Sequence, residues 1–483
     1  AYDSLQQQEK LTKNPDLTQV INATKISGRN RNGLGIGVFN GMTTNTWAEA
    51  QDTITAESRR IATQPFTNYN VLVFDQNLKN QSYVTLINTN YWTPDWKYNA
   101  NVTGAETKLL NEANTFALKG LLNVSQIYDN PKKPVLGYRS FLNIYRPGGT
   151  IRYSLSSEVL DKKYDPNDMG YLDRNNEVRN YGSLSYNINT PVWKILNSRT
   201  AFEAKYYSRY QPYDLMFIDL EINNSTTFRN FWKFYEEIAY RPTGNYDYYE
   251  PRVDGWYFYQ PPSWDGGLEV SSDSRKKVAA DGEVGFFYHP ENKRMMYWMS
   301  LEPRYRISDR LMIALSSEYS GINRDYGWVD TRYDDLQDPV IFFGRRDVLA
   351  VNNVLDMRYA FTKDISLNLR ARHYWSKVEY DSFYTLQRDG TLLPAEYEEN
   401  ENIDFNAFNL DLQFLWFFAP GSQMSLVWKN NILTMGDAPS DNYFKAFDEM
   451  IGAPQTNSLS LRVLYYLDYV MLRKTFRKKE KNK

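Results

Sequence analysis

The feature of this chain that most restricts its fold is a two-residue alternation of apolar and polar side chains. It recurs within residues 33–38, 151–159, 216–223, 295–307, 311–319, 355–361, 408–418 and 459–469. In 408–418 the apolar members are Phe408, Leu410, Leu412, Phe414, Trp416 and Phe418. Successive side chains of a β-strand point to opposite faces, so this period predicts strands with one apolar and one polar face. The chain is therefore predicted to be all-β.

Two architectures contain many strands of this kind. A soluble sandwich or propeller buries its apolar face and uses strands of typically 5–6 residues. A transmembrane barrel turns that face to lipid, needs strands of about 9–11 residues, and carries aromatic residues at both interfaces. Here the polar faces carry Arg, Glu, Asp and Asn in series, and aromatic residues, which form 16% of the chain, gather at strand ends. We therefore predict an antiparallel transmembrane outer-membrane β-barrel.

The connections between the predicted strands alternate in length. Short turns are expected at Pro147-Gly148-Gly149, Asn189-Thr190-Pro191, Ser308-Asp309, Thr362-Lys363-Asp364 and Ala419-Pro420-Gly421. Long polar connections are expected at 161–177, 240–275, 320–338, 376–404 and 434–456. Outer-membrane barrels have short periplasmic turns, long extracellular loops and even strand numbers, so we expect roughly 18–22 strands, with about 20 as the best value. The predicted organisation is a periplasmic segment 1–17, a barrel 18–472 and a basic periplasmic tail 473–483.

Composition excludes several classes of protein. The 56 Lys and Arg nearly balance the 58 Asp and Glu, for a net charge of −2, so the basic surface of a nucleic-acid-binding protein is missing. With no cysteine there are no disulfides, thiol nucleophiles or cysteine-ligated metals. No apolar run is long enough for a membrane-spanning helix. The chain starts at Ala1 without a visible signal peptide, as expected of a processed or truncated product.

No enzyme active site is evident in the sequence. The only histidines, His289 and His373, are expected at an interface or in the lumen rather than as catalytic bases. The common nucleophile-elbow, phosphate-loop and zinc-protease motifs do not occur. The chain is therefore not expected to be an enzyme.

The acidic stretch 164–177 is the most specific group of polar residues. Asp165, Asn167, Asp168 and Asp173 offer oxygen ligands around a glycine, as a hard cation such as calcium prefers. The alternative is a loop in which these side chains accept hydrogen bonds from their own backbone, in Asx turns. Beyond calcium, no cofactor is expected.

Aromatic residues cluster in the connection 245–268 and near residue 328. The candidate ligand or partner residues are Tyr246, Tyr249, Trp256, Tyr257, Trp264 and Trp328. Exposed Tyr and Trp supply contact area at low entropic cost, which suits a platform for stacking sugars or a protein contact. A loop folded into the barrel mouth as its own small core is the third possibility.

Several segments resemble one family of outer-membrane barrels of Bacteroidota, catalogued only as having unknown function. The resemblance is found at 21–28, at 33–43, at 67–88 (TNYNVLVFDQNLKNQSYVTLIN), at 343–375 (FGRRDVLAVNNVLDMRYAFTKDISLNLRARHYW) and at 457–469. Members usually carry an N-terminal domain similar to carbohydrate-binding module family 9. No such domain precedes residue 20 here, which puts carbohydrate binding by this chain in doubt. The resemblance implies the outer membrane of a Gram-negative bacterium.

A pore or transport channel for polar solutes is the first functional expectation. The expected lumen charges are Glu158, Glu221, Glu302, Arg304, Arg306, Arg358, Arg370 and Arg372. Charges of both signs predict weak ion selectivity. A structural or scaffold subunit of an outer-membrane complex is the alternative, and glycan binding or processing follows only from the resemblance. The expected partners are outer-membrane lipid, other outer-membrane or periplasmic proteins, and glycans.

Overall fold

The structure is a computed structural model that describes residues 5–6, 8–94, 98–129, 133–440 and 442–466. Nearly all of its regular structure is antiparallel β-strand, as the alternation predicted. Within the described ranges, α1 (Tyr443–Ile451) is the only helix, and no helix there is long and apolar enough to cross a membrane. The predicted basic tail 473–483 lies outside the described residues.

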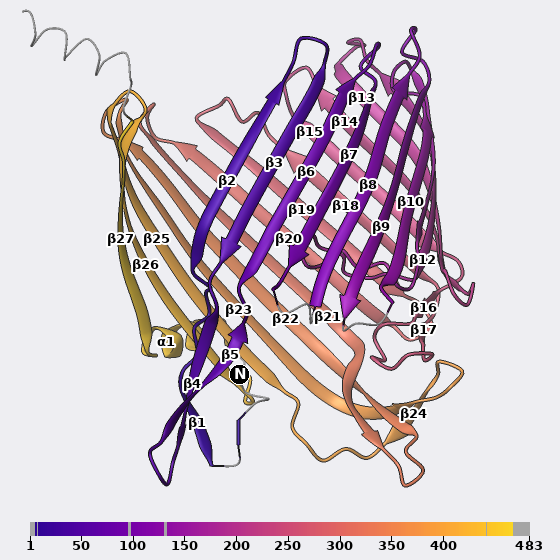
Figure 1. Cartoon of the computed structure of the whole chain (residues 1–483). Helices are drawn as coiled ribbons and strands as arrows, with labels where there is room; N and C mark the ends of the chain where they lie inside the picture. The colour runs from indigo at the N-terminus through magenta and orange to yellow at the C-terminus, as the bar shows by residue number, and fades with distance from the viewer. Residues whose placement is uncertain (1–4, 7, 95–97, 130–132, 441, 467–483) are drawn as a thin grey trace, which may run out of the picture. The chain divides into compact units, whose positions relative to one another are not determined.

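The chain forms two compact units, each with its own antiparallel sheet. The first comprises Ala1–Asn187 and Ala201–Ile218. In its sheet, strands that follow one another along the chain are hydrogen-bonded neighbours (Figure 1). In order, these are β2 (Val20–Arg29), β3 (Leu34–Thr43), β6 (Thr67–Asn77), β7 (Tyr83–Trp92), β8 (Tyr98–Leu110), β9 (Ala117–Asp129), β10 (Val135–Tyr145), β11 (Ile151–Leu160) and β12 (Glu177–Ile188).

The second unit comprises Ile188–Thr200 and Asp219–Lys483. Its strands follow the same neighbour-to-neighbour order. They are β14 (Leu215–Phe228), β15 (Lys233–Arg241), β18 (Ser263–Ser271), β19 (Val278–His289), β20 (Arg294–Arg306), β21 (Leu311–Tyr333), β22 (Pro339–Ala360), β23 (Ile365–Leu386), β25 (Ile403–Ala419), β26 (Ser422–Gly436) and β27 (Gln455–Leu464). β13 (Ile195–Arg209) and β14 contribute residues to both units.

A separate three-stranded sheet interrupts the first unit between β3 and β6. In it, β4 (Thr46–Asp52) lies between β1 (Glu9–Lys13) and β5 (Ser58–Gln64). Ala48, Ala50 and Ile61 form its buried core. Residues 9–13 and 46–64 therefore belong to a small sheet of their own, which the sequence did not indicate.

Three strands of the second unit are much longer than a membrane requires. β21 has 23 residues, and β22 and β23 have 22 each. Most of 320–338 and much of 376–404, both predicted as loops, are therefore strand. The predicted loop 240–275 also contains β16 (Asn245–Asp247), β17 (Phe258–Gln260) and all of β18. The sequence did not indicate these strand extensions, because charged and aromatic residues there interrupt the alternation of apolar and polar side chains.

The long connections all lie at one end of each sheet, and the connections at the opposite end are short. In the first unit, residues 30–33, 78–82, 111–116 and 146–150 join strands at one end, while 44–66 and 161–176 lie at the other. In the second unit, 307–310, 361–364 and 420–421 are short, while 242–262, 387–402 and 437–454 lie at the opposite end. β24 (Leu392–Ala395) pairs with the end of β23 within one of these long connections.

The two faces of the second sheet differ in chemistry. Across β22 and β23, Met357 pairs with Leu369 on one face, while Asp356 pairs with Arg370 on the other. Apolar residues on other strands of this sheet are exposed: 56% of Leu301 on β20 and 64% of Leu461 on β27 are accessible. Of the two clusters of buried apolar residues, one lies in the small sheet, and the other packs the aromatic connection against the ends of β22 and β23. The apolar face is therefore not buried by the described residues.

Candidate functional site: the polar faces of the two sheets

The predicted lumen residue Glu158 lies on the polar face of the first sheet, between two arginines. Arg139 on β10 and Arg179 on β12 place guanidinium nitrogens 2.7 and 3.5 Å from its carboxylate oxygens. The register explains this, because Glu158 on β11 is the direct cross-strand partner of Arg179. Glu158 is 14% exposed, so the triad neutralises a largely buried carboxylate. The main role of Glu158 in the fold is therefore to balance the charge of the neighbouring arginines.

Glu221, Glu302 and Arg304 lie on the polar face of the second unit. Glu221 on β14 accepts a hydrogen bond of 2.7 Å from the Asn223 amide. On β20, the Arg304 guanidinium pairs with Asp281 of β19 and lies 3.8 Å from the Glu302 carboxylate. The predicted charges Glu302 and Arg304 therefore lie close together on β20, and the ion-pair partner on β19, Asp281, was not predicted.

The other predicted arginines form a basic patch on β20, β22 and β23. Arg306, Arg358, Arg370 and Arg372 all lie on the polar face. Within the described part of the chain, none of the four has a carboxylate at ion-pair distance. Arg372 donates to the Asn352 side-chain oxygen at 2.9 Å. Asp356 of β22 and Asp411 of β25 are the direct cross-strand partners of Arg370, so carboxylates adjoin this patch without reaching ion-pair distance.

An acidic patch, not predicted from the sequence, occupies the same polar face on β15, β18 and β19. It comprises Glu237, Asp265, Glu269 and Glu283. Glu269 and Glu283 are direct cross-strand partners, and like charges in that position are destabilising. Folding stability therefore does not account for this arrangement. Alternation in the sequence indicated the polar face, but the grouping of like charges depends on which strands become neighbours.

The aromatic connection 245–268 packs largely against the strands beside it. Trp256 is 7% exposed and shares a buried cluster with Phe258 and with Ile341, Phe343 and Leu386 from β22 and β23. Tyr246 and Tyr257 have ring centroids 5.6 Å apart. Tyr249 donates its backbone N–H to Asp247 at 2.9 Å. This geometry favours the small-core alternative for most of the predicted partner residues.

Of the two other aromatic candidates, Trp328 packs against this cluster, and Trp264 lies on β18. Trp264 stacks on Tyr240 with centroids 4.3 Å apart and remains 42% exposed. The Arg252 guanidinium lies 3.7 Å from the Trp328 ring centroid, and Trp328 donates its backbone N–H to Glu250. Arg252 and Arg388, which covers Trp256 at 4.0 Å, were not predicted. Cation–π contacts of this kind leave no local sequence pattern.

The predicted calcium ligands hold the loop 161–176 in shape. The Asp165 carboxylate accepts from the Asn167 N–H at 3.0 Å, and the Asn167 side chain accepts from the Leu172 N–H at 2.6 Å. Asp168 accepts from the Tyr98 hydroxyl at 2.8 Å, and Asp173 pairs with Arg174 at 3.5 Å. Among the described residues, no group of three or more His, Asp or Glu side chains could hold a metal ion. The geometry favours the Asx-turn alternative.

Both histidines are held by hydrogen bonds to neighbouring groups. His289 Nδ1 lies 2.8 Å from the Pro261 carbonyl oxygen. His373 Nδ1 lies 2.8 Å from the Tyr443 hydroxyl of α1, and Nε2 lies 3.3 Å from the Asn406 side-chain oxygen. These contacts fix the position of each ring in the fold.

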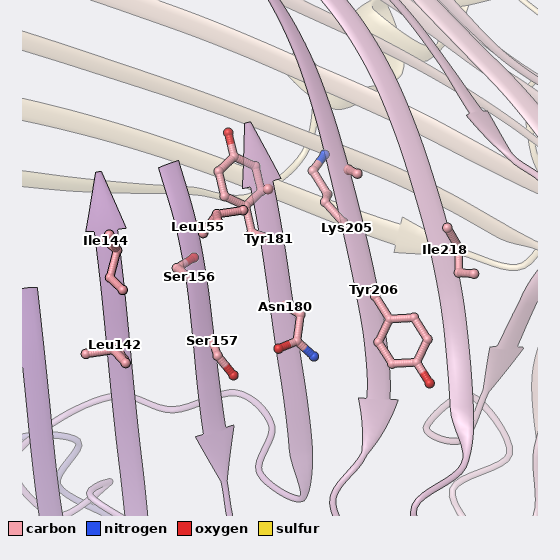
Figure 2. A pocket seen from close by; sticks show the side chains of 12 residues that line it. Leu142, Ile144, Leu155, Ser156, Ser157, Asn180, Tyr181, Lys205, Tyr206 and Ile218 are labelled. Atoms are coloured by element: carbon pink, nitrogen blue, oxygen red, sulfur yellow. The ribbon is translucent and has the colours of Figure 1, made fainter. Parts of the chain in front are cut away.

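A hollow of about 470 Å³ crosses β10 to β14 in the first unit (Figure 2). Figure 2 shows the hydroxyls of Ser157 and Tyr206 and the amide of Asn180 among aliphatic side chains. Lys205 is the only charged residue in its lining. The hollow therefore lacks the opposed charges that mark the second unit.

A sequence model of a protein family, described as domain of unknown function DUF5916, matches residues 1–476. No curated protein matches the chain.

Proposed function

We propose that this chain, which belongs to the DUF5916 family, is an integral outer-membrane β-barrel that forms a pore for polar solutes. One observation carries the proposal: long antiparallel strands expose apolar side chains on one face and charged side chains on the other. A soluble sheet would bury its apolar face against a second layer. Lipid satisfies that face instead, and water satisfies the polar one.

The proposed barrel joins the strands of both units into one closed wall. Closure leaves no exposed sheet edge in the lipid, where each unpaired backbone group would cost several kcal/mol. A barrel of about 20 strands exceeds the 16–18 strands that already leave an aqueous channel. The acidic and basic patches would then line that channel. Their opposite signs predict weak net ion selectivity.

A scaffold role is the alternative, and the packed aromatic loop favours it. Trp256, Phe258 and their neighbours make a buried cluster at the long-loop end of β22 and β23. The cluster fixes the loop, and Trp264, which stacks on Tyr240 and remains 42% exposed, is an aromatic side chain suited to contact with another outer-membrane protein. Glycan binding is a further proposal, and only the family resemblance supports it.

Single-channel recording in a planar bilayer tests the pore. The purified, detergent-extracted chain is expected to give discrete, reproducible conductance steps with a reversal potential near zero in a salt gradient. Protein unfolded before reconstitution is the control and should give none. Silence from protein that migrates as a folded, heat-modifiable barrel would exclude an open pore and favour the scaffold. Strong preference for one ion sign would contradict the assignment of both charged patches to the channel.

A further inference from the structure

A pocket of about 370 Å³ lies at the short-turn end of β20 to β23 in the second unit. Three arginines line it: Arg306, Arg310 and Arg358. Asp309 is the single carboxylate in the lining. The pocket therefore gathers three positive charges against one negative charge.

The strand register places two of these arginines on one face. Arg306 of β20 pairs with Met312 of β21, and Met312 pairs with Arg358 of β22. Both side chains consequently lie in one row of the polar face, separated by a single strand. Arg358 in turn pairs with Asn368 of β23, which also lines the pocket.

The third arginine comes from the turn between β20 and β21. Ser308 Oγ accepts hydrogen bonds from the backbone N–H groups of Arg310 and Leu311, at 3.2 and 3.1 Å. The Ala360 N–H, two residues after Arg358, donates to the Arg310 carbonyl at 2.8 Å. The turn is thus fixed to the end of β22, which holds Arg310 beside Arg358.

The three guanidinium groups have no acidic partner of their own. Within the described ranges, no carboxylate lies at ion-pair distance from Arg306, Arg310 or Arg358, and that includes Asp309. Like charges held together repel, so an anion that enters the pocket lowers the electrostatic free energy. The Ser366 hydroxyl and the Asn368 amide add neutral hydrogen-bond donors to the lining.

We propose that this pocket binds the phosphate group of an organic phosphate. The guanidinium fork matches phosphate oxygens in a bidentate manner, and three forks suit a group that carries two negative charges. At about 370 Å³ the pocket is within the size range of small-ligand sites, so it has room for the esterified group as well. The binding does not depend on whether the chain conducts.

Calorimetric titration of the purified full chain in detergent, with glycerol 3-phosphate and inorganic phosphate as probes, tests the pocket. Saturable binding is expected at physiological salt. Arg358→Gln and Arg306→Gln should each weaken it about ten-fold or more, the usual effect of losing a charge-assisted hydrogen bond. Asp309→Asn should strengthen it, because a repelling carboxylate is removed. Arg372→Gln is the matched control: it removes a charge from the same face, outside the pocket lining.

A lipid phosphate has the same chemistry and is distinguished by a second measurement. Protein in nanodiscs of phosphatidylglycerol and of phosphatidylcholine would retain the anionic lipid in an Arg358-dependent way if the source is lipid. The proposal would be overturned if Arg358→Gln and Arg372→Gln weakened binding of the soluble phosphates or of the lipid equally. It would also be overturned if neither bound. If the chain binds phosphate but gives no conductance, only the pore proposal fails. If it conducts but binds no phosphate, only the proposal of a phosphate pocket fails.

Discussion

At the scale of single residues, the polar faces contain charges in two different situations. Glu158 is held between Arg139 and Arg179 and is 14% exposed. Glu302 is 41% exposed, and its nearest guanidinium nitrogen, on Arg304, is 3.8 Å away. A largely buried carboxylate between two arginines contributes more to stability than an exposed one, because its loss removes the carboxylate at 2.7 Å from Arg139, while Arg179 keeps Glu177 at 2.6 Å.

We expect Glu158→Gln to lower the free energy of unfolding by about 1–3 kcal/mol. Glu302→Gln, the matched control from the second unit, should change it by less than about 1 kcal/mol. Urea unfolding of each variant in lipid, followed by tryptophan fluorescence, measures both. Equal effects would show that the Arg139–Glu158–Arg179 triad adds nothing beyond an ordinary exposed pair.

At the scale of elements, one ion pair ties the first strand of the small sheet to the third. Arg59 of β5 reaches across β4 to Glu9 of β1, with Nε 2.6 Å from one carboxylate oxygen. The hydrogen bonds from Arg59, and then that from the Gln6 N–H, lower the pKa of Glu9 from 4.5 to about 2. The folded sheet therefore favours the charged form of Glu9.

A lowered carboxylate pKa gives the sheet a defined pH dependence. The stabilisation from Glu9 is complete above pH 4.5, the ordinary pKa, and is lost as the pH falls toward about 2. Amide hydrogen exchange of residues 8–13, corrected for intrinsic rates, should therefore accelerate as the pH falls from 4.5 toward about 2. Glu9→Gln should accelerate exchange at the higher pH and remove most of this dependence. Glu49→Gln, which loses only a 3.9 Å contact with Lys13, should preserve it; a flat profile in the unmodified chain would contradict the role of Glu9.

At the scale of the whole molecule, each sheet has one end that carries its long connections. The small sheet of β1, β4 and β5 lies at the same end of the first sheet as the long loop 161–176. The sequence predicted that 1–17 is periplasmic and that the long loops are extracellular. Because residues 9–13 and the loop 161–176 lie at the same end, only one of these two predictions can be right for the proposed barrel.

The absence of cysteine makes the sidedness of the proposed barrel directly measurable. Ile54→Cys, at a position 72% exposed in the β4–β5 turn, and Asp335→Cys, in the β21–β22 turn, lie at the long-connection ends. Asn32→Cys and Asp364→Cys lie in short turns. With a membrane-impermeant maleimide, intact cells should label only the first pair, and permeabilised cells should label all four. Labelling of Asn32→Cys together with Ile54→Cys in intact cells would contradict the proposed orientation.

For much of the candidate site, the sequence predicted which residues lie on the polar face but not which of them contact one another. Alternation assigned Arg358 and Arg370 to a polar face, and the register confirms that they lie on one. The sequence did not reveal the acidic patch around Glu269 and Glu283, because these residues lie in separate strands and face each other only through pairing. It also presented Trp256 as a candidate partner residue, whereas the structure buries it against Phe343. Burial of a loop residue depends on distant strands that local composition does not report.

The sequence by itself determined the all-β antiparallel fold and the two chemically different faces of its strands. Both follow from a period of two, which is a property of neighbouring residues along one strand. The tertiary structure decided the small sheet, the length of β21 to β23, the triad at Glu158 and the arginine pocket at Arg306 and Arg358. Each of these depends on cross-strand register, which brings together residues far apart in the chain, and a repeating alternation fits many registers equally well.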